Sequence, residues 1–349
     1  MPIGATMRAV VQNGIGGPEI LQVQSRPTPS QPGGDQVLIR VRAAGVCYHD
    51  LLVRDGTFRH LVQLPLIPGH EMAGDVRAIG EAVTRIKVGD QVASTNRETC
   101  GHCDLCHSGQ EGLCPNQRFF GHNCPGGYAE FVLARENALS VVPRSIPPEI
   151  ACTLSCAVGT ELHGIREVGR AKAGDTVLVT GAGGGLGIHG VQVAKLCGAF
   201  VVGLTTTATK AHAIRAAGAD EVVVIERGER FDKKLREVAS GGFDVICDNV
   251  GQPVFDSCFR TLAIGGRYVF IGQLNDRAIS CNPAWLLLRN TALLGSNSST
   301  RRELDEVVKF VDRGLIKPVV DRAMPLEDAP IAHRRVMAAE ATGRVVLKP

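Results

Sequence analysis

Six apolar runs of strand length lie between residues 176 and 296, and a stretch long enough for a helix separates each from the next. Alternation of this kind is typical of βαβ units packed around a parallel sheet. Six strands are enough for a complete doubly wound domain, so this part of the chain is expected to have an α/β fold. The predicted strands are Thr176–Thr180, Phe200–Leu204, Glu221–Ile225, Asp244–Asp248, Arg267–Gly272 and Ala292–Ser296.

A glycine-rich turn directly follows the first predicted strand, and Ile188, Val191 and Ala194 give the helix after it an apolar side. Glycines let the backbone approach a pyrophosphate, and a helix N-terminus offers free N–H groups to its charge. This context favours dinucleotide binding over a merely tight turn. The predicted cofactor contacts are Gly181, Gly183, Gly184, Gly185, Leu186, Gly187, Val250 and Gly272.

The end of the second predicted strand lacks the acid that usually holds the 2′-hydroxyl of NAD. Thr205, Thr206 and Thr207 stand there instead, with Lys210 nearby. Hydroxyl donors and a cation suit a 2′-phosphate, so NADP(H) is favoured over NAD(H). The alternative is that the threonines cap the next helix and Lys210 is a solvated charge.

Residues 7–142 have a different sequence pattern, with short β-like runs such as Gln36–Val41 broken by Gly and Pro. A chain of 349 residues is also longer than a single hydrophobic core usually supports, so two domains are expected. We therefore predict a β-rich domain from residues 1–157, a cofactor domain from 158–296, and a tail, 297–349, that returns to the first domain.

The formal charge of +3 is spread along the chain without basic blocks, which argues against nucleic-acid or membrane partners. No apolar segment is long enough to span a bilayer, and residues 1–17 lack a signal-peptide pattern. A cytoplasmic location is expected. In that compartment, 12 cysteines indicate metal ligation plus buried thiols rather than disulfides.

Four cysteines fall at close spacing, with two, two and seven residues between them, in the loop 97–115. Four thiolates fit one tetrahedral zinc, and such a closed site leaves no position for substrate. The loop is therefore predicted to bind a structural zinc, and its scarcity of basic charge argues against a nucleic-acid-binding module. The ligands are Cys100, Cys103, Cys106 and Cys114.

Cys47, His70 and Cys156 are dispersed, and their spacing alone does not unite them. Singly, such residues are more often packing than ligands. In order and context, however, these motifs resemble the zinc-containing medium-chain dehydrogenases/reductases over essentially the whole chain. The resemblance implies a GroES-like first domain, a Rossmann cofactor domain and a homodimer or homotetramer. It also implies a catalytic zinc bound by Cys47, His70 and Cys156. Glu71 would be an exchangeable ligand of this zinc, and Asp50 would orient His70. Thr160 would contact the nicotinamide, and Arg344 would contact the cofactor phosphates.

Alcohol dehydrogenases of that family usually carry Ser or Thr two residues after the first ligand, whereas this chain has His49. An imidazole can pass a proton near neutral pH, so a relay with a different partner is one interpretation. The other is that His49 contacts cofactor phosphate or solvent.

The segments Cys47–Leu52, Gly187–Lys195 and Gly203–Thr206 are similar to zinc-type acryloyl-CoA reductases, which use NADPH. That resemblance implies a basic entrance for CoA phosphates. The candidates, each of which is alternatively a solvated surface charge, are Arg54, Arg59, Arg301 and Arg302.

The leading hypothesis is zinc-dependent hydride exchange between NADP(H) and an alcohol, aldehyde or ketone, with two zinc ions per subunit. Zinc with three protein ligands and an open position acts as a Lewis acid on a substrate oxygen. The second hypothesis is NADPH-dependent reduction of an α,β-unsaturated thioester or enone. The third is a non-catalytic cofactor-binding protein, against which the complete zinc ligand set argues.

Overall fold

The computed structural model describes residues 4–349, which form two compact units; residues 1–3, the start of the predicted first domain, lie outside the described residues. Unit 1 comprises residues up to 156, 299–314 and 320–349, and unit 2 comprises 157–298 and 315–319. The sequence placed the divisions at 157/158 and 296/297. Residues 315–319 join unit 2 because Gln192 exchanges two hydrogen bonds with the backbone of Lys317, and His189 accepts one from the N–H of Val319.

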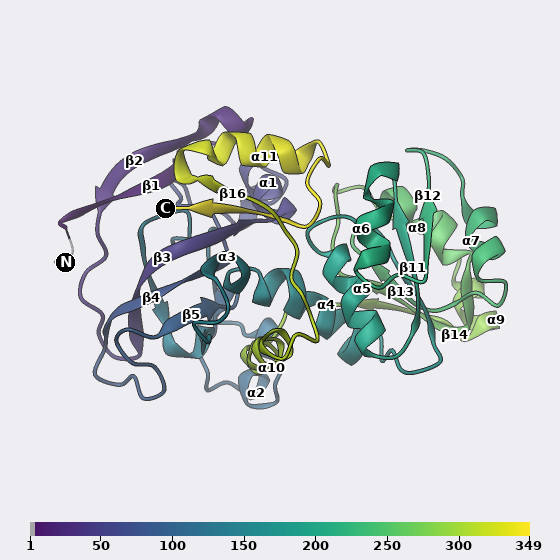
Figure 1. Cartoon of the computed structure of the whole chain (residues 1–349), viewed down its shortest axis with the longest axis horizontal. Coiled ribbons are helices and arrows are strands. Elements are labelled where there is room, and N and C mark those ends of the chain that lie inside the picture. The colour runs from purple at the N-terminus through teal and green to yellow at the C-terminus, as the bar shows by residue number, and fades with distance from the viewer. Residues whose placement is uncertain (1–3) are drawn as a thin grey trace. The chain divides into compact units, whose positions relative to one another are not determined.

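Unit 2, coloured teal to green in Figure 1, contains a six-stranded parallel sheet in the order β12-β11-β10-β13-β14-β15. This arrangement confirms the predicted doubly wound α/β fold. Only β14 starts well before its predicted position, because Leu262 pairs with Phe243 and the ladder tolerates a register shift around Gly265 and Gly266. The strands are β10 (Thr176–Val179), β11 (Phe200–Thr205), β12 (Glu221–Val224), β13 (Phe243–Asp248), β14 (Leu262–Phe270) and β15 (Ala292–Gly295).

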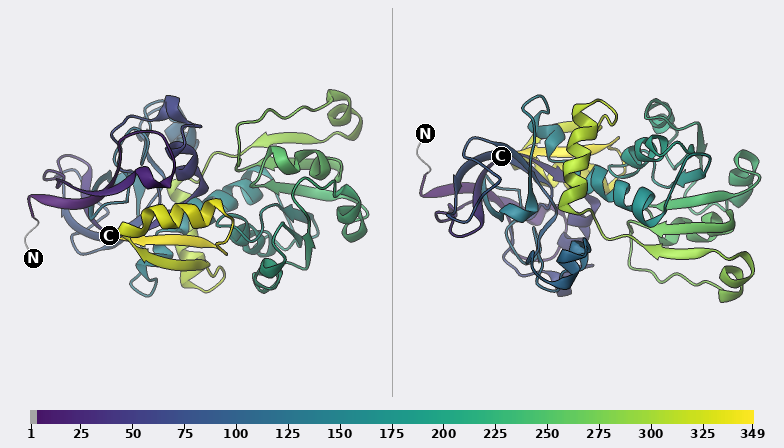
Figure 2. Two further views of the ribbon diagram at one scale, coloured as in Figure 1. Left: turned by 90° about the horizontal axis from the view of Figure 1, so that it is seen from above. Right: turned by 90° about the horizontal axis from the view of Figure 1, so that it is seen from below.

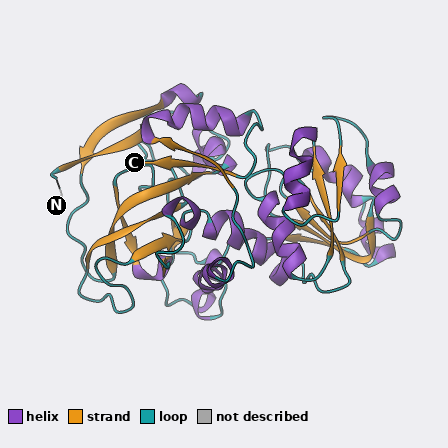
Figure 3. Ribbon diagram, in the orientation of Figure 1, coloured by secondary structure: helices purple, strands orange, loops and turns teal. Residues whose placement is uncertain are grey.

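Helices cover both faces of this sheet (Figure 3). The apolar positions Ile188, Val191 and Ala194 of α5 are all buried, as the sequence pattern predicts. On the other face, α7 and α8 pack on a core that includes Ile246 and Tyr268. The helices are η5 (Leu154–Gly159), which begins in unit 1, α4 (Thr160–Leu162), η6 (His163–Val168), α5 (Gly187–Leu196), η7 (Ala208–Lys210), α6 (Ala211–Ala216), α7 (Asp232–Val238), α8 (Gln252–Phe259) and α9 (Pro283–Arg289).

Unit 1 is built on a seven-stranded mixed sheet in the order β16-β17-β3-β4-β5-β9, with β8 also paired to β3. The tail returns to this sheet, where β17 runs antiparallel to β3. Two further pairs, β1-β2 and β6-β7, lie outside it. The strands are β1 (Thr6–Gln12), β2 (Leu21–Pro27), β3 (Gln36–Val46), β4 (Met72–Ile79), β5 (Gln91–Ser94), β6 (Arg97–Glu98), β7 (Arg118–Phe119), β8 (Phe131–Arg135), β9 (Leu139–Val141), β16 (Val320–Pro325) and β17 (Arg344–Lys348).

The helices of unit 1 are short apart from α10 and α11, and α11 packs beside the C-terminal strands (Figure 2). A capping box between Thr300 and Glu303 starts α10. None of the helices in the described chain has the length and apolar character required to traverse a lipid bilayer. The helices are η1 (Pro18–Ile20), α1 (Tyr48–Arg54), η2 (Arg59–Leu61), α2 (Asp104–His107), η3 (Glu111–Leu113), η4 (Glu136–Ala138), α3 (Pro148–Ala151), α10 (Arg301–Asp312), η8 (Leu326–Asp328) and α11 (Ala329–Met337).

Truncating Leu347, a fully buried residue of β17, tests whether the tail stabilises unit 1. The change Leu347→Ala is expected to lower the free energy of unfolding by about 3 kcal/mol, because it leaves a cavity between β17 and its neighbours. Urea denaturation provides the measurement. Val88→Ala, at a 61 % exposed position of the same unit, is the control and should change stability by less than about 0.5 kcal/mol. Equal effects of the two changes would contradict the packing described.

Candidate metal and cofactor sites

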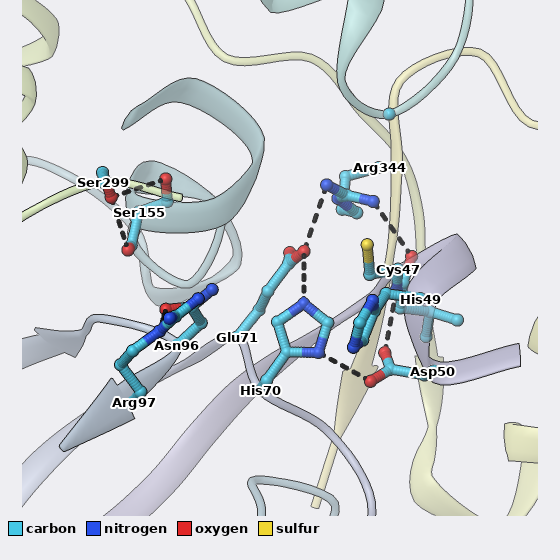
Figure 4. Close-up of polar contacts among 12 residues, drawn as sticks. Cys47, His49, Asp50, His70, Glu71, Asn96, Arg97, Ser155, Ser299 and Arg344 are labelled. Atoms are coloured by element: carbon cyan, nitrogen blue, oxygen red, sulfur yellow. Dashed lines mark hydrogen bonds and ion pairs between the residues drawn. The ribbon is translucent and has the colours of Figure 1, made fainter. Parts of the chain in front are cut away.

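Four buried side chains of unit 1 come together as a candidate catalytic metal site, and Figure 4 labels three of them, Cys47, His70 and Glu71. Cys47 lies between β3 and α1, His70 and Glu71 directly precede β4, and Cys156 lies in the π-helical turn η5. One ligand atom from each lies within 4.8 Å of the others. Two thiols, an imidazole and a carboxylate match the donors and the compact spacing that zinc requires.

Two glycines allow these segments to pack so closely. A Cβ atom at Gly45 would lie 2.1 Å from Oε2 of Glu71, and one at Gly69 would lie 2.3 Å from the ring of Tyr128. Gly69 also has a φ of +94°, which side-chain-bearing residues rarely adopt. The backbone therefore reserves room for the carboxylate of Glu71 and for the turn that presents His70.

Asp50 fixes the orientation of His70. One carboxylate oxygen lies 2.8 Å from Nδ1 of His70, and the other accepts a hydrogen bond of 3.0 Å from the N–H of Cys47. Burial alone would lower the pKa of His70, but the Asp50 carboxylate holds it well above its usual value. The same interaction keeps the pKa of Asp50 low despite its burial. Nε2 of His70 is thereby directed toward the other ligands.

Glu71 is buried beside a cation. Its Oε1 lies 3.0 Å from Nη2 of Arg344, and Nη1 of the same arginine donates a hydrogen bond to the carbonyl of Val46. Burial raises the pKa of Glu71 to about 7, although Arg344 opposes the shift. The structure thus places Arg344 among the metal-site residues, and its contact with cofactor phosphates stays a prediction.

A hydrogen bond links the side chains of the two cysteines. The hydrogen bond from Cys156 holds the pKa of Cys47 well below its usual value, with Arg344 and His70 acting in the same direction. The pKa of Cys156 is raised by the same hydrogen bond and by burial. A thiolate is therefore stabilised at Cys47, and thiolate is the form that ligates a metal.

His49 lies beside this cluster, with its ring centroid 5.4 Å from that of His70. Its Nε2 is 2.8 Å from Nε2 of His122, and the two rings stack at 4.8 Å. Burial lowers the pKa of His49 to about 4 and that of His122 to about 3. Both imidazoles are therefore neutral at pH 7, and one donates its N–H to the other.

The four cysteines of loop 97–115 also come together. Their sulfur atoms form a compact set, with separations of 3.5 Å for Cys103 and Cys106 and 3.6 Å for Cys100 and Cys114. Backbone hydrogen bonds lower the pKa of Cys100 to about 6, whereas burial raises that of Cys106 to about 12. Sulfur-only ligation of this geometry suits a structural zinc.

The predicted cofactor residues of unit 2 gather at the carboxyl ends of the parallel strands. A Cβ at Gly187 would lie 2.4 Å from the carbonyl oxygen of Gly181, so the turn closes only with glycine. The Cβ position of Gly181 faces Val250 at 3.2 Å, and the N–H of Gly272 bonds to the carbonyl of Asp248. Gly183, Gly184, Gly185 and Leu186 lie within the same turn, between β10 and α5.

Thr205 is the last residue of β11, Thr206 and Thr207 follow it, and Lys210 ends η7. Thr207 precedes η7 without a side-chain capping bond, and Oγ1 of Thr205 accepts from its N–H; Thr206 is exposed. Lys210 is only 7 % exposed, and its side chain runs across Gly183. It is therefore not the solvated charge of the alternative interpretation. Thr160 of α4 is also buried, and its hydroxyl has no hydrogen-bond partner among residues 4–349.

Sequence reasoning missed two residues near His49. His122 and Phe119 follow the four-cysteine loop. The ring of Phe119 stacks against that of His49 and is tilted by 45° against that of His122. His49 and His122 are 73 residues apart, and no sequence periodicity relates positions at that separation. The one sequence signal for His122 was its place shortly after the predicted metal-binding loop.

The arginines proposed for a CoA entrance do not form one group. Arg54 is buried, where it donates to the carbonyl of Gly16 and contacts His333, so it is neither an entrance residue nor a surface charge. Arg301 and Arg302 pair with acids of their own helix, α10, and Arg59 is exposed.

Comparison with known proteins identifies the family to which this chain belongs. Residues 33–144 match the alcohol dehydrogenase GroES-like domain, and residues 185–313 match the zinc-binding dehydrogenase domain. The chain is 34 % identical to an acryloyl-coenzyme A reductase of Sulfurisphaera tokodaii, over 98 % of this chain and 100 % of the relative. It belongs to the zinc-containing medium-chain dehydrogenase/reductase family.

Two other members of this family are similarly close. An alcohol dehydrogenase of Geobacillus stearothermophilus is 34 % identical over 94 % of this chain and 96 % of the relative. The crystal structure of an NAD-dependent alcohol dehydrogenase superposes with a TM-score of 0.93 at 32 % identity, covering 98 % of this chain and 100 % of that one. The chain is accordingly a zinc-family oxidoreductase, and the non-catalytic hypothesis is set aside.

Replacing Asp50 tests whether it orients a metal ligand. Asp50→Asn removes the negative charge that faces Nδ1 of His70 and is expected to weaken zinc binding by about 10- to 100-fold. Zinc release to a chromogenic chelator measures this. Asp55→Asn, at an exposed position just past α1, is the matched control and should release zinc as the wild type does. Wild-type release from Asp50→Asn would show that the carboxylate has no such role.

Proposed function

We propose that this protein catalyses hydride exchange between NADP(H) and an alcohol, aldehyde or ketone at a catalytic zinc held by Cys47, His70 and Cys156, with Glu71 exchangeable. The observation that carries the proposal is the buried, mutually close ligand set beside a pair of neutral histidines. Sequence identity does not decide the substrate, since the acryloyl-CoA reductase and the alcohol dehydrogenase are equally similar.

Zinc at this site would supply Lewis acidity toward a substrate oxygen, and the nicotinamide would supply or accept the hydride. The protein side chains prepare the site. Asp50 keeps His70 in one orientation, and Arg344 compensates the buried charge of Glu71. Phe119 and the histidine rings form an aromatic wall beside the ligands, which would keep water from a bound substrate and so strengthen electrostatic interactions inside the site.

His49 and His122 give the site a proton path. Reduction of a carbonyl requires one proton at the oxygen, and oxidation of an alcohol releases one. A neutral imidazole can accept a proton on one ring nitrogen while it loses one from the other. The 2.8 Å contact between the two Nε2 atoms joins two such groups in series, so the pair can replace the hydroxyl that the family usually carries at position 49.

Catalysis by the metal site predicts that NADPH-dependent reduction of short aldehydes falls by roughly a thousandfold in Cys47→Ala, because several kcal/mol of charge stabilisation is lost. NADPH consumption is followed spectrophotometrically, with zinc content measured in parallel. Cys197→Ala, outside both cysteine clusters, is the control and should retain activity. Aldehyde turnover that survives Cys47→Ala unchanged would refute the zinc mechanism.

The second candidate function is NADPH-dependent reduction of an α,β-unsaturated thioester. It is favoured by His49, which departs from the alcohol dehydrogenase pattern, and by the relative named acryloyl-coenzyme A reductase. The same assay with acryloyl-CoA separates the two candidates. Turnover of acryloyl-CoA without any turnover of aldehydes would replace the first proposal by the second.

The preference for NADP(H) rests on the end of β11, which has no acid to repel a 2′-phosphate and has Lys210 packed against the glycine turn. We expect kcat/KM to be higher for NADPH than for NADH. Lys210→Ala should lower it about tenfold for NADPH, the value of one charge-assisted hydrogen bond, and affect NADH less. Lys172→Ala, at an exposed lysine of the same unit, is the control. A clear preference of the wild type for NADH would overturn this choice.

A further inference from the structure

Unit 2 contains a cavity on the side of the sheet covered by α7, α8 and α9. The cavity has a volume of about 260 Å³. This is slightly below the usual range for drug-sized ligands and suits a small metabolite. Its lining consists of four cations, one acid and two large apolar side chains: Arg230, Arg236, Arg260, Arg289, Asp232, Trp285 and Leu288.

The cavity walls are held in place by contacts that leave cationic groups available. Arg236 donates from one Nη to the carbonyl of Arg260, and Arg289 donates from one Nη to the carbonyl of Leu262. The guanidinium of Arg260 lies 4.6 Å from the ring centroid of Trp285. Each arginine has five N–H donors, so these contacts use only part of the capacity of Arg236 and Arg289.

The charges of this cluster are not balanced by acids. Asp232 is the one carboxylate in the lining, and it pairs with Arg230 at 2.7 Å. Within residues 4–349, no carboxylate forms an ion pair with Arg236, Arg260 or Arg289. The lining therefore has a net charge of +3.

A simpler interpretation is that these arginines only neutralise helix ends, since Arg236 and Arg289 lie in the last turns of α7 and α9 and Arg260 ends α8. Each helix C-terminus contributes at most about half a negative charge. Three such ends leave about half of the cationic charge uncompensated.

The aromatic wall limits which ligands fit. Phe259 stacks on Trp285 with ring planes at 9°, and Arg260 covers the indole as well. Trp285 is therefore not offered for stacking with a nucleobase. Its edge and Leu288 provide apolar surface beside the cations, which suits a short aliphatic group.

This cluster is separate from the dinucleotide site. Leu262, the residue that Arg289 contacts, is the first residue of β14, whereas Gly272 follows the carboxyl end of that strand. The two ends of a nine-residue strand are roughly 25 Å apart.

We propose that this cavity is a second ligand site of unit 2, which binds a small phosphate monoester with its phosphate on the arginines and its organic group against Trp285 and Leu288. The proposal is independent of the proposed function.

Trp285 is the only tryptophan of the chain, so its emission reports on this cavity. Titration of the purified full-length protein with butyl phosphate should give a saturable change in emission and a rise in unfolding temperature. Arg236→Gln and Arg289→Gln should each weaken binding about tenfold or more, because each removes charge-assisted hydrogen bonds. Arg215→Gln, at an exposed position of α6, is the matched control and should bind as the wild type does.

Three further arms can overturn the proposal. Sodium chloride at equal ionic strength must not reproduce the change in Trp285 emission, and titration with 1-butanol must not give a saturable change. Inorganic phosphate should bind more weakly than butyl phosphate, and equal affinities would overturn the assignment to an ester. A flat response to butyl phosphate, or binding unchanged in Arg236→Gln, would overturn the site itself. Arg236 is exposed, so its substitution tests binding without disturbing the core.

Discussion

A chain of buried charges, from Asp50 through His70 and Glu71 to Arg344, is the constraint on which unit 1 depends. The N···O distances between successive groups in this chain are 2.8, 3.8 and 3.0 Å, and no group is more than 4 % exposed. Burying charge is costly unless every group is paired. The strands and turns that supply them must therefore meet in one arrangement, which fixes where the metal ligands lie.

The sequence predicted the features that local pattern determines. The six strands of unit 2 follow from apolar runs, and the four-cysteine group follows from its spacing. Cys47, His70 and Cys156 could not be united in that way, because antiparallel pairing and a later helical turn bring them together; only the family resemblance linked them. The contact of His49 with His122 was not predictable, since no backbone periodicity connects α1 with the turn after β7.

Arg97 connects the four-cysteine loop to the histidine pair. Its guanidinium donates to the carbonyl of Gly112, within the loop, and lies 4.9 Å from the ring centroid of Phe119. Phe119 in turn contacts the rings of His49 and His122. The loop that we predict to bind the structural zinc and the proposed proton path are thus joined through one buried cation, so the fold of the loop also sets the position of the aromatic ring beside His49.

The antiparallel pairing of β17 with β3 has a consequence for the order of events on the ribosome. Cys47, His70, Glu71 and Cys156 are all synthesised before the whole of unit 2, whereas Arg344 follows it. Until β17 is made, the carboxylate of Glu71 lacks its buried counterion. A nascent chain therefore contains all four of these side chains before it contains the cation that pairs with Glu71, and that buried ion pair can form only once the tail has returned to β3.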